Sequence, residues 1–339
     1  MTKDILNTIK RLLNQPKKVI IVPHQNPDGD AMGSCLGLAI FLEKLGHKST
    51  VIAPNDYPKF LKWLPKSKSV IQFEQQSQEA TDKLKEAELI FILDFNALHR
   101  VGAKMESVLS ELKTPMIVID HHQQPENFTN LIYSDTSICS TCQMVYQFIE
   151  KLNQLNKINA DIATCLYTGI MTDTGSFKFN STTSKTHRIT ADLIDKGAAN
   201  AKIHNLVYDT NTFNRLQLLG RALSNLKVLP EFNTAYISIS EADKQEFNFK
   251  KGDTEGFVNY GLSIDGIRLA VIFIEDAQQG LIKMSLRSKG DFSVNQLARK
   301  YFNGGGHNNA AGGRYHSTLK EAIKFFVNIL PEYKHKLTK

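Results

Sequence analysis

Short apolar runs alternate with stretches of helical periodicity along the first two thirds of the chain. The runs have the length of strands and occur at Val19–Val22, Thr50–Ala53, Leu89–Leu93 and Met116–Ile119. Helical patterns separate them, the clearest over Ala31–Leu45, which is followed by Gly46, a residue suited to a left-handed helix cap. Continuous apolar strands between helices are typical of a parallel sheet that helices cover on both faces. The pattern therefore predicts an α/β domain.

The pattern weakens after two further helical stretches, at Ser140–Gln154 and Ala160–Met171. Polar residues dominate between Gly197 and Asn214, as expected of a connection between domains. We therefore expect a first domain over residues 1–197, a linker over 198–214 and a second domain over 215–339.

The remaining chain mixes strand and helix patterns around a glycine-rich stretch, Gly304–Gly313. Strand patterns occur at Thr234–Ser240, Ile267–Ile274 and Leu281–Arg287, and helical patterns at Phe213–Leu226, Ser293–Phe302 and Leu319–Leu330. This mixture predicts a smaller α+β domain.

Composition adds limits to this outline. Hydrophobic residues make up 42% and charged residues 22% of the 339 residues, which excludes a disordered or fibrous chain. No apolar run approaches the ~18 to 20 residues that cross a bilayer, so we expect a cytoplasmic protein with no membrane partner. The net charge of +7 favours an anionic partner without identifying it. Cys139 and Cys142 form a single CxxC, which is too few thiols for a zinc ribbon, so we expect buried, reduced cysteines.

Acidic and histidine side chains follow the predicted strands of the first domain. His24, Asp28 and Asp30 come after the first strand, Asp94 ends another, Asp120, His121 and His122 end the next, and Asp173 follows the helix Ala160–Met171. The carboxyl ends of parallel strands form one rim, where ligands bind. We therefore expect these side chains to meet at that rim.

So many carboxylates in one place repel each other unless cations neutralise them. Carboxylate and imidazole ligands without thiolates suit Mn²⁺ best, with Mg²⁺, Co²⁺ or Fe²⁺ as alternatives, and their number favours two ions that share a bridging carboxylate. Each feature alone has an ordinary explanation, since Asp-Gly-Asp is typical of a turn, and Asp94 or Asp173 of a helix cap. Their joint occurrence at successive strand ends favours the metal site.

The ordered set of these residues resembles a known family. His24-x-x-x-Asp28-x-Asp30-x-x-Gly33-Ser34, Asp94, Asp120-His121-His122 and Asp173 resemble the motifs of the DHH phosphoesterase superfamily. Gly304-Gly305-Gly306-His307 followed by Ala310-Ala311-Gly312-Gly313 resembles the DHHA1 substrate domain. The resemblance extends from about Lys18 to about Phe326 and covers nearly the whole chain.

The resemblance implies a role for each residue at the rim. His24 and Asp28 would hold a first metal ion, Asp30, His121 and Asp173 a second, and Asp94 would bridge the two. Asp120 would orient His121, since metal-bound imidazoles usually donate their other N–H to a carboxylate. His122 would lie near the scissile phosphate, to stabilise charge or protonate the leaving oxygen.

Substrate-binding candidates lie mainly in the second domain. Gly304, Gly305 and Gly306 allow backbone N–H groups to converge around an anion as a nest, with His307 as a further donor. Arg287 is similar to a DHHA1 arginine that contacts substrate phosphate, a task that suits its planar fork. Arg100 and Ser181 are weaker candidates, because a surface arginine and a loop serine are the ordinary explanations.

The resemblance implies hydrolysis of a phosphate ester by water that two metal ions activate. The group that fits best hydrolyses short single-stranded RNA to mononucleotides or 3′-phosphoadenosine-5′-phosphate (pAp) to AMP, as a 3′–5′ exoribonuclease or bisphosphate nucleotidase. A cyclic or linear dinucleotide phosphodiesterase and a polyphosphate or other phosphoanhydride hydrolase remain alternatives, and a non-catalytic nucleotide-binding regulator is the weakest one. The sequence also leaves open whether the chain forms a homodimer.

Overall fold

The computed structural model describes residues 1–338 and divides into two compact units, Met1–Thr210 and Asn211–Lys339. The division lies within the predicted linker 198–214. Most of that segment is nevertheless a helix, α8 (Asn200–Tyr208), because buried Ile203 packs into the core of the first unit.

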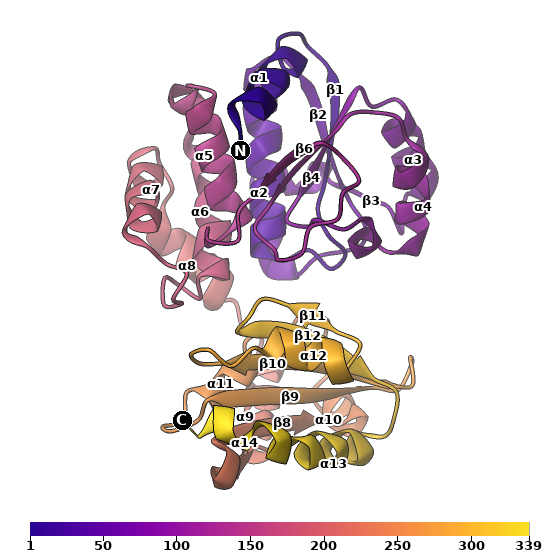
Figure 1. Cartoon of the computed structure of the whole chain (residues 1–339), viewed down its shortest axis with the longest axis vertical. Helices are drawn as coiled ribbons and strands as arrows, with labels where there is room; N and C mark the ends of the chain where they lie inside the picture. The colour runs from indigo at the N-terminus through magenta and orange to yellow at the C-terminus, as the bar shows by residue number, and fades with distance from the viewer. Residues whose placement is uncertain (339) are drawn as a thin grey trace. The chain divides into compact units, whose positions relative to one another are not determined.

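A six-stranded parallel sheet forms the centre of the first unit, with the strand order β3-β2-β1-β4-β5-β6 (Figure 1). The strands are β1 (Lys18–Val22), β2 (Lys48–Ala53), β3 (Ile71–Gln72), β4 (Leu89–Leu93), β5 (Met116–Asp120) and β6 (Leu131–Ser134). The chain runs outward from β1 to β3 in one direction and from β4 to β6 in the other. The sheet therefore has its switch point between β1 and β4, where parallel sheets place their ligands.

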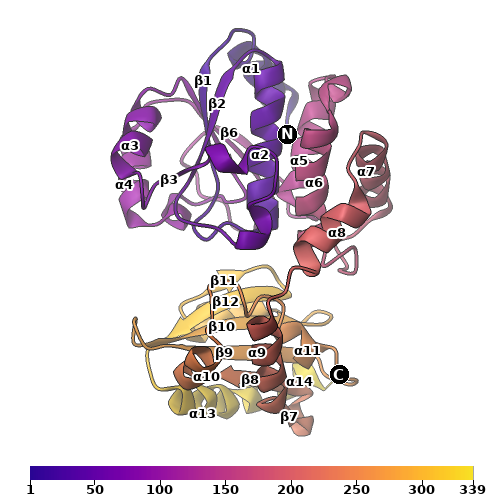
Figure 2. The same cartoon turned by 180° about the vertical axis from the view of Figure 1, so that it is seen from behind.

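Helices cover both faces of this sheet, as the apolar pattern predicts (Figures 1 and 2). Val19 and Ile21 of β1 face a core shared with α2, α5 and α6, whereas Ile20 and Val22 face a core shared with α3 and α4. The helices are α1 (Lys3–Leu12), α2 (Gly29–Lys44), α3 (Ser77–Lys85), α4 (Ala103–Glu111), α5 (Thr141–Lys151), α6 (Ala160–Asp173), α7 (Ser184–Asp195) and α8. The predicted α/β class is confirmed.

Helices α2 and α6 pack closely because glycines line their contact. A Cβ atom on Gly33 would lie 2.5 Å from the backbone oxygen of Cys165, and one on Gly169 would lie 2.2 Å from Sγ of Cys142. This close approach holds the start of α2 next to the body of α6 and the start of α5. The glycines thus help to place the ends of three helices that carry site residues.

The second unit has a mixed sheet with the order β11-β12-β10-β9-β8-β7, in which β8 and β9 pair in parallel and the other neighbours are antiparallel. Its strands are β7 (Lys227–Leu229), β8 (Thr234–Ile239), β9 (Leu269–Asp276), β10 (Leu281–Ser288), β11 (Gly305–Gly306) and β12 (Ala310–Tyr315). Its helices are α9 (Phe213–Ser224), α10 (Glu241–Glu246), α11 (Val258–Leu262), α12 (Val294–Tyr301), α13 (Leu319–Ile329) and α14 (Lys334–Leu337). Helices α12 and α13 pack on one face and α9 and α11 on the other, so the predicted α+β domain is confirmed.

The structure bears on the cysteines and on membrane-spanning helices, both of which the composition addressed. The four cysteines are all buried and free, as expected. Between residues 1 and 338, no helix has both the length and the apolar character that crossing a membrane requires.

We expect Gly169→Ala to destabilise the first unit. The added methyl group would lie 2.2 Å from Sγ of Cys142 and 2.9 Å from Oδ1 of Asp30, so the helices must shift. Overpacking of this kind costs about 1 to 3 kcal/mol, which urea unfolding in EDTA would measure. Gly220→Ala is the control, because its Cβ meets nothing within 4 Å on exposed α9 and should add up to about 1 kcal/mol. Unchanged stability of Gly169→Ala would contradict this account of the helix contact.

Candidate metal centre and active site

The acidic and histidine residues predicted to meet do so at the carboxyl ends of β1, β4 and β5. Helix α2 brings its first turn to this edge of the sheet, and α6 brings its last residue, Asp173. Most of the side chains in this cluster are buried, among them Asp30 and Asp94, each 1% exposed. The parallel topology therefore assembles the cluster from segments that are far apart in the sequence.

His24 and Asp28 form one end of the cluster. His24 Nδ1 donates to the backbone oxygen of Gln25 at 2.9 Å, which turns Nε2 toward the carboxylates, 3.5 Å from Oδ2 of Asp94 and 4.0 Å from Oδ2 of Asp28. Asp28 is the N-cap of α2, and its Oδ1 accepts from the N–H groups of Asp30 and Ala31. The cap bonds occupy one oxygen of Asp28 and leave the other on the side of His24.

Asp94 lies in the middle of the cluster. Its Oδ2 lies 3.5 Å from His24 Nε2, and its Oδ1 lies 3.5 Å from His121 Nε2. The residue has a φ of 66°, in the left-handed region, and its N–H donates to the backbone oxygen of Ile119 at 3.1 Å. This uncommon conformation at the end of β4 directs the carboxylate between the two histidines.

Asp30, His121 and Asp173 form the other end. His121 Nδ1 donates to the backbone oxygen of Ile138 at 3.0 Å, and its Nε2 lies 3.7 Å from Oδ2 of Asp30 and 3.5 Å from Oδ2 of Asp173. Asp30 accepts two N–H groups at the start of α5, from Thr141 at 2.6 Å and from Cys142 at 2.8 Å. These bonds hold the buried Asp30 carboxylate in place.

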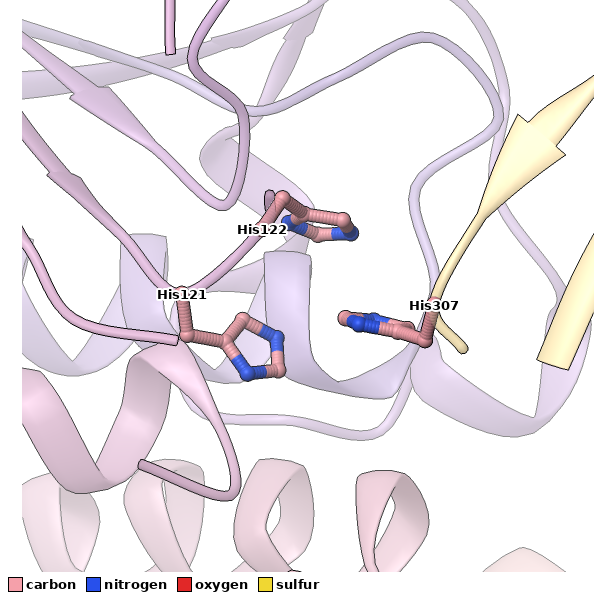
Figure 3. A group of neighbouring side chains, drawn as sticks. All are labelled: His121, His122 and His307. Carbon is pink, nitrogen blue, oxygen red and sulfur yellow. The ribbon is translucent and has the colours of Figure 1, made fainter. Parts of the chain in front are cut away.

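Asp120 holds His122, so the prediction that it orients His121 is wrong. Oδ1 of Asp120 accepts from His122 Nδ1 at 2.7 Å, and Oδ2 accepts from the His122 N–H at 2.9 Å. His121 and His122 lie side by side (Figure 3). Their ring centres are 4.9 Å apart, and the ring planes differ by 72°. The ring planes of the two imidazoles differ, and His121 is oriented by the Ile138 carbonyl instead.

The charges of the cluster perturb its titration. Burial raises the pKa of Asp94 well above its usual value, and the negative charges of Asp30 and Asp28 add to this. Burial also raises the pKa of Asp30. Burial lowers the pKa of His121, but the charges of Asp173 and Asp30 outweigh it and keep the pKa above the ordinary value. The ionised cluster therefore carries an excess of buried negative charge.

This donor set fits a pair of divalent cations. Ligand atoms of His24, Asp28 and Asp94 lie within 4.8 Å of one another, and so do those of Asp30, Asp94 and His121. The two groups share Asp94, and Asp173 adjoins the second through His121. Carboxylate oxygens and imidazole nitrogens without thiolates are ligands for Mn²⁺, Mg²⁺ and related ions, and two positive ions would relieve the buried negative charge.

The two weaker candidates of the first unit have different surroundings. Burial lowers the pKa of His24, and the charge of Asp28 opposes this. The positive charge of nearby Arg100 lowers the pKa further. The backbone oxygen of Arg100 also accepts from the N–H of Gln25 at 2.8 Å. Ser181 is exposed in the turn between α6 and α7. The structure thus brings Arg100 to the cluster, while a role for Ser181 stays a prediction.

Two residues that the sequence did not single out support the cluster. Asn96, 6% exposed, donates from Nδ2 to the backbone oxygens of His122 at 2.9 Å and Gln123 at 3.3 Å, which holds the segment after β5. Thr141 contacts both Asp30 and Asp94. The only signal for Thr141 was its place directly after Ser140, a residue typical of a helix start.

In the second unit, the glycine-rich stretch is a tight hairpin and not the expected nest. Gly305 and Gly306 of β11 pair with β12, and His307 in the connecting turn donates its N–H to Ala310 at 2.7 Å. The N–H of Gly304 is also used, by the backbone oxygen of Ala298 at 3.2 Å. Glycine is needed for close packing, since a Cβ on Gly304 would lie 2.0 Å from the oxygen of Gly312.

Arg287 lies on β10 beside this hairpin. It pairs with Ala310 of β12 on one side and with Ala270 of β9 on the other, and its side chain is half-buried. Strand pairing therefore places Arg287 next to the end of the hairpin that carries His307.

We expect Asp94→Asn to weaken the binding of both metal ions, because Asp94 belongs to both ligand groups and an amide is a poorer ligand than a carboxylate. Equilibrium dialysis with Mn²⁺ should show two ions per wild-type chain and at least tenfold weaker binding by the variant, in line with the 10- to 100-fold effects of perturbing a metal site. Asp82→Asn on exposed α3 is the matched control and should bind as the wild type does. Two tightly bound ions in Asp94→Asn would contradict the shared position of this carboxylate.

Comparison with known proteins places this geometry in a family. Residues 18–170 match the DHH family, N-terminal domain, and residues 232–334 match the DHHA1 domain. The first match spans the parallel sheet and the cluster at its edge, apart from Asp173 at the end of α6. The second spans the mixed sheet from β8 to β12, including Arg287 and the glycine hairpin.

Whole-chain relatives agree with both matches. The chain is 32% identical to the bifunctional oligoribonuclease and PAP phosphatase NrnA of Thermus thermophilus, over 95% of this chain and 90% of that protein. It is 30% identical to the protein of the same name from Bacillus subtilis, over 88% and 90%. The crystal structure of an exopolyphosphatase-related protein from Bacteroides fragilis, 39% identical and covering 100% of both chains, superposes with a TM-score of 0.95. The chain therefore belongs to the DHH family and carries a C-terminal DHHA1 domain.

Proposed function

We propose that this protein is a metal-dependent phosphoesterase that hydrolyses short single-stranded oligoribonucleotides to mononucleotides and pAp to AMP. The observation that carries the proposal is the pair of ligand groups that share Asp94. The Thermus thermophilus and Bacillus subtilis relatives are named for these two activities, and the similarity extends over most of both chains. Four buried, free cysteines suit a reducing compartment, and we propose a cytoplasmic location on that ground.

His24, Asp28 and Asp94 would hold one cation, and Asp30, Asp94, His121 and Asp173 the other. We favour Mn²⁺ because the donors are a mixture of carboxylates and imidazoles without thiolates. When bound, two such cations would lower the pKa of a shared water and neutralise the non-bridging oxygens of the phosphate.

His122 is our candidate for proton transfer to the leaving oxygen. Its Nδ1 is held by Asp120 at 2.7 Å, which assigns the transfer to Nε2 and stabilises the protonated imidazole. The second bond, from the His122 N–H to Asp120, fixes the backbone as well, so ring and main chain are oriented by the same carboxylate. Asp120 is thus a positioning residue for His122.

We assign phosphate recognition to side chains that are positively charged or that donate hydrogen bonds. Arg100 lies close enough to influence His24 and is our candidate for a contact to the scissile phosphate in the first unit. Arg287, His307 and the Gly304–Gly306 segment are the candidates in the second unit. Because the backbone of the hairpin is largely committed to strand pairing, we assign recognition there mainly to the side chains of Arg287 and His307.

A hydrolysis panel with Mn²⁺ tests the proposed function. The panel compares pAp, a linear diribonucleotide, a five-nucleotide RNA, cyclic di-AMP, polyphosphate and pyrophosphate, each with and without EDTA. We expect mononucleotide release from the short RNAs and phosphate release from pAp, both abolished by EDTA. In the same panel, Arg287→Ala should raise KM at least tenfold, because a charged hydrogen bond to phosphate is lost. Absence of hydrolysis of RNA and pAp would refute the proposal.

Phosphoanhydride hydrolysis is the second candidate. The Bacteroides fragilis protein, which superposes over its whole length, is described as exopolyphosphatase-related. The same cations would also activate water toward a P–O–P bond. Faster release from polyphosphate than from RNA or pAp in the panel would favour this candidate.

We expect Asp120→Asn to lower kcat and to leave Mn²⁺ binding within a few-fold of the wild-type value. An amide cannot balance the charge of a protonated His122, so the proton transfer loses support, at a cost of about 10²-fold or more. Metal binding should persist because His121 is oriented by Ile138. A parallel loss of Mn²⁺ affinity would instead indicate that Asp120 supports the metal ligands.

A further inference from the structure

Helix α5 begins at the centre of the carboxylate cluster, and its first residue contacts two of the carboxylates. Thr141 is fully buried. Its N–H donates to Oδ2 of Asp30 at 2.6 Å, and its hydroxyl Oγ1 donates to Oδ1 of Asp94 at 2.9 Å. One residue thus joins an acidic side chain from the start of α2 to one from the end of β4.

The hydrogen bond from the Thr141 hydroxyl is made to Asp94, the carboxylate that belongs to both ligand groups. Asp94 directs Oδ2 to His24 and Oδ1 to His121, each at 3.5 Å from Nε2. Rotation about the last side-chain bond of an aspartate meets only a low barrier, so the backbone alone does not determine the plane of this carboxylate. The bond from Thr141 selects the rotation in which the two oxygens face the two histidines.

Capping of α5 does not require this hydroxyl. Ser140 is the N-cap, and its own hydroxyl accepts from the N–H of Gln143 at 3.1 Å. Two other buried threonines bond within their own helices: Thr168 donates to the backbone oxygen of Thr164 at 2.7 Å, and Thr190 donates to that of Thr186 at 2.8 Å. Thr141 instead donates across the fold to a residue 47 positions away in the sequence. Its side chain therefore serves the cluster rather than the helix.

We infer that Thr141 is a positioning residue for the metal centre, whose hydroxyl holds the shared carboxylate of Asp94 in the orientation that serves both ligand groups. The inference rests on the proposed function only in that divalent cations bind at this cluster. It assigns a role to a side chain that is not itself one of the ligands, because its hydroxyl contacts a ligand oxygen.

The test compares three variants by Mn²⁺ binding, measured by equilibrium dialysis without substrate. Thr141→Val keeps the branched shape and the N–H bond to Asp30 but removes the hydroxyl. Thr141→Ser keeps the hydroxyl and removes the methyl group. Thr190→Val is the control, because it removes a buried threonine hydroxyl of the same unit that bonds only within α7.

We expect Thr141→Val to bind Mn²⁺ about tenfold or more weakly, as when other groups that orient metal ligands are removed. Thr141→Ser should stay within about threefold of the wild type, and Thr190→Val should be unchanged. Thermal unfolding in EDTA shows whether each variant folds, and Thr141→Ala replaces Thr141→Val if the valine is not accommodated.

Three outcomes overturn the inference. Wild-type affinity in a folded variant without the hydroxyl would show that Asp94 needs no support from Thr141. An equal loss in Thr141→Ser would assign the effect to packing of the methyl group. If the wild-type chain binds no Mn²⁺, both the metal centre and the proposed function are refuted. The first two outcomes, in contrast, leave the proposed function intact.

Discussion

Electrostatic repulsion among buried carboxylates is the constraint on which the rest of the first unit depends. Asp30 and Asp94 are almost completely buried, and this burial, to which the neighbouring negative charges add, raises the pKa of Asp94 well above its usual value. Such an arrangement destabilises the fold unless cations or protons compensate it. Two features of the fold hold the carboxylates in this arrangement. Helix α5 donates two N–H groups to Asp30, and the glycines between α2 and α6 allow these helices to pack closely. A cluster of buried charged groups that destabilises the fold in this way is typical of a functional site.

Each of the three histidines of the cluster is oriented by a hydrogen bond from its Nδ1. His24 is held by its neighbouring carbonyl, His121 by Ile138, and His122 by Asp120. The two imidazoles of adjacent residues therefore have different partners. His121 joins the ligand group of Asp30 and Asp94, while His122 is bonded to Asp120.

The two units differ in sheet topology and therefore in the kind of site that each can form. A parallel sheet with a switch point between β1 and β4 concentrates polar side chains at one edge, which suits a metal centre. The mixed sheet of the second unit instead carries a glycine hairpin beside the strand of Arg287. Glycine is required at position 304 because the backbone of Gly312 approaches it closely.

Local pattern determined much of this protein by itself. The apolar run Leu89–Leu93 is β4 without a change of boundary, and the acidic and histidine residues after successive strands are the ones that meet, because parallel strands share one edge. Tertiary structure alone decided that Asp120 serves His122, that Thr141 joins Asp30 to Asp94, and that the glycine stretch is a hairpin. These features rest on hydrogen bonds whose geometry depends on how whole elements pack, in the case of Thr141 and Asp30 across 111 positions of sequence. Spacing along a chain shows which groups share an edge of the sheet, but not which atoms of those groups face one another.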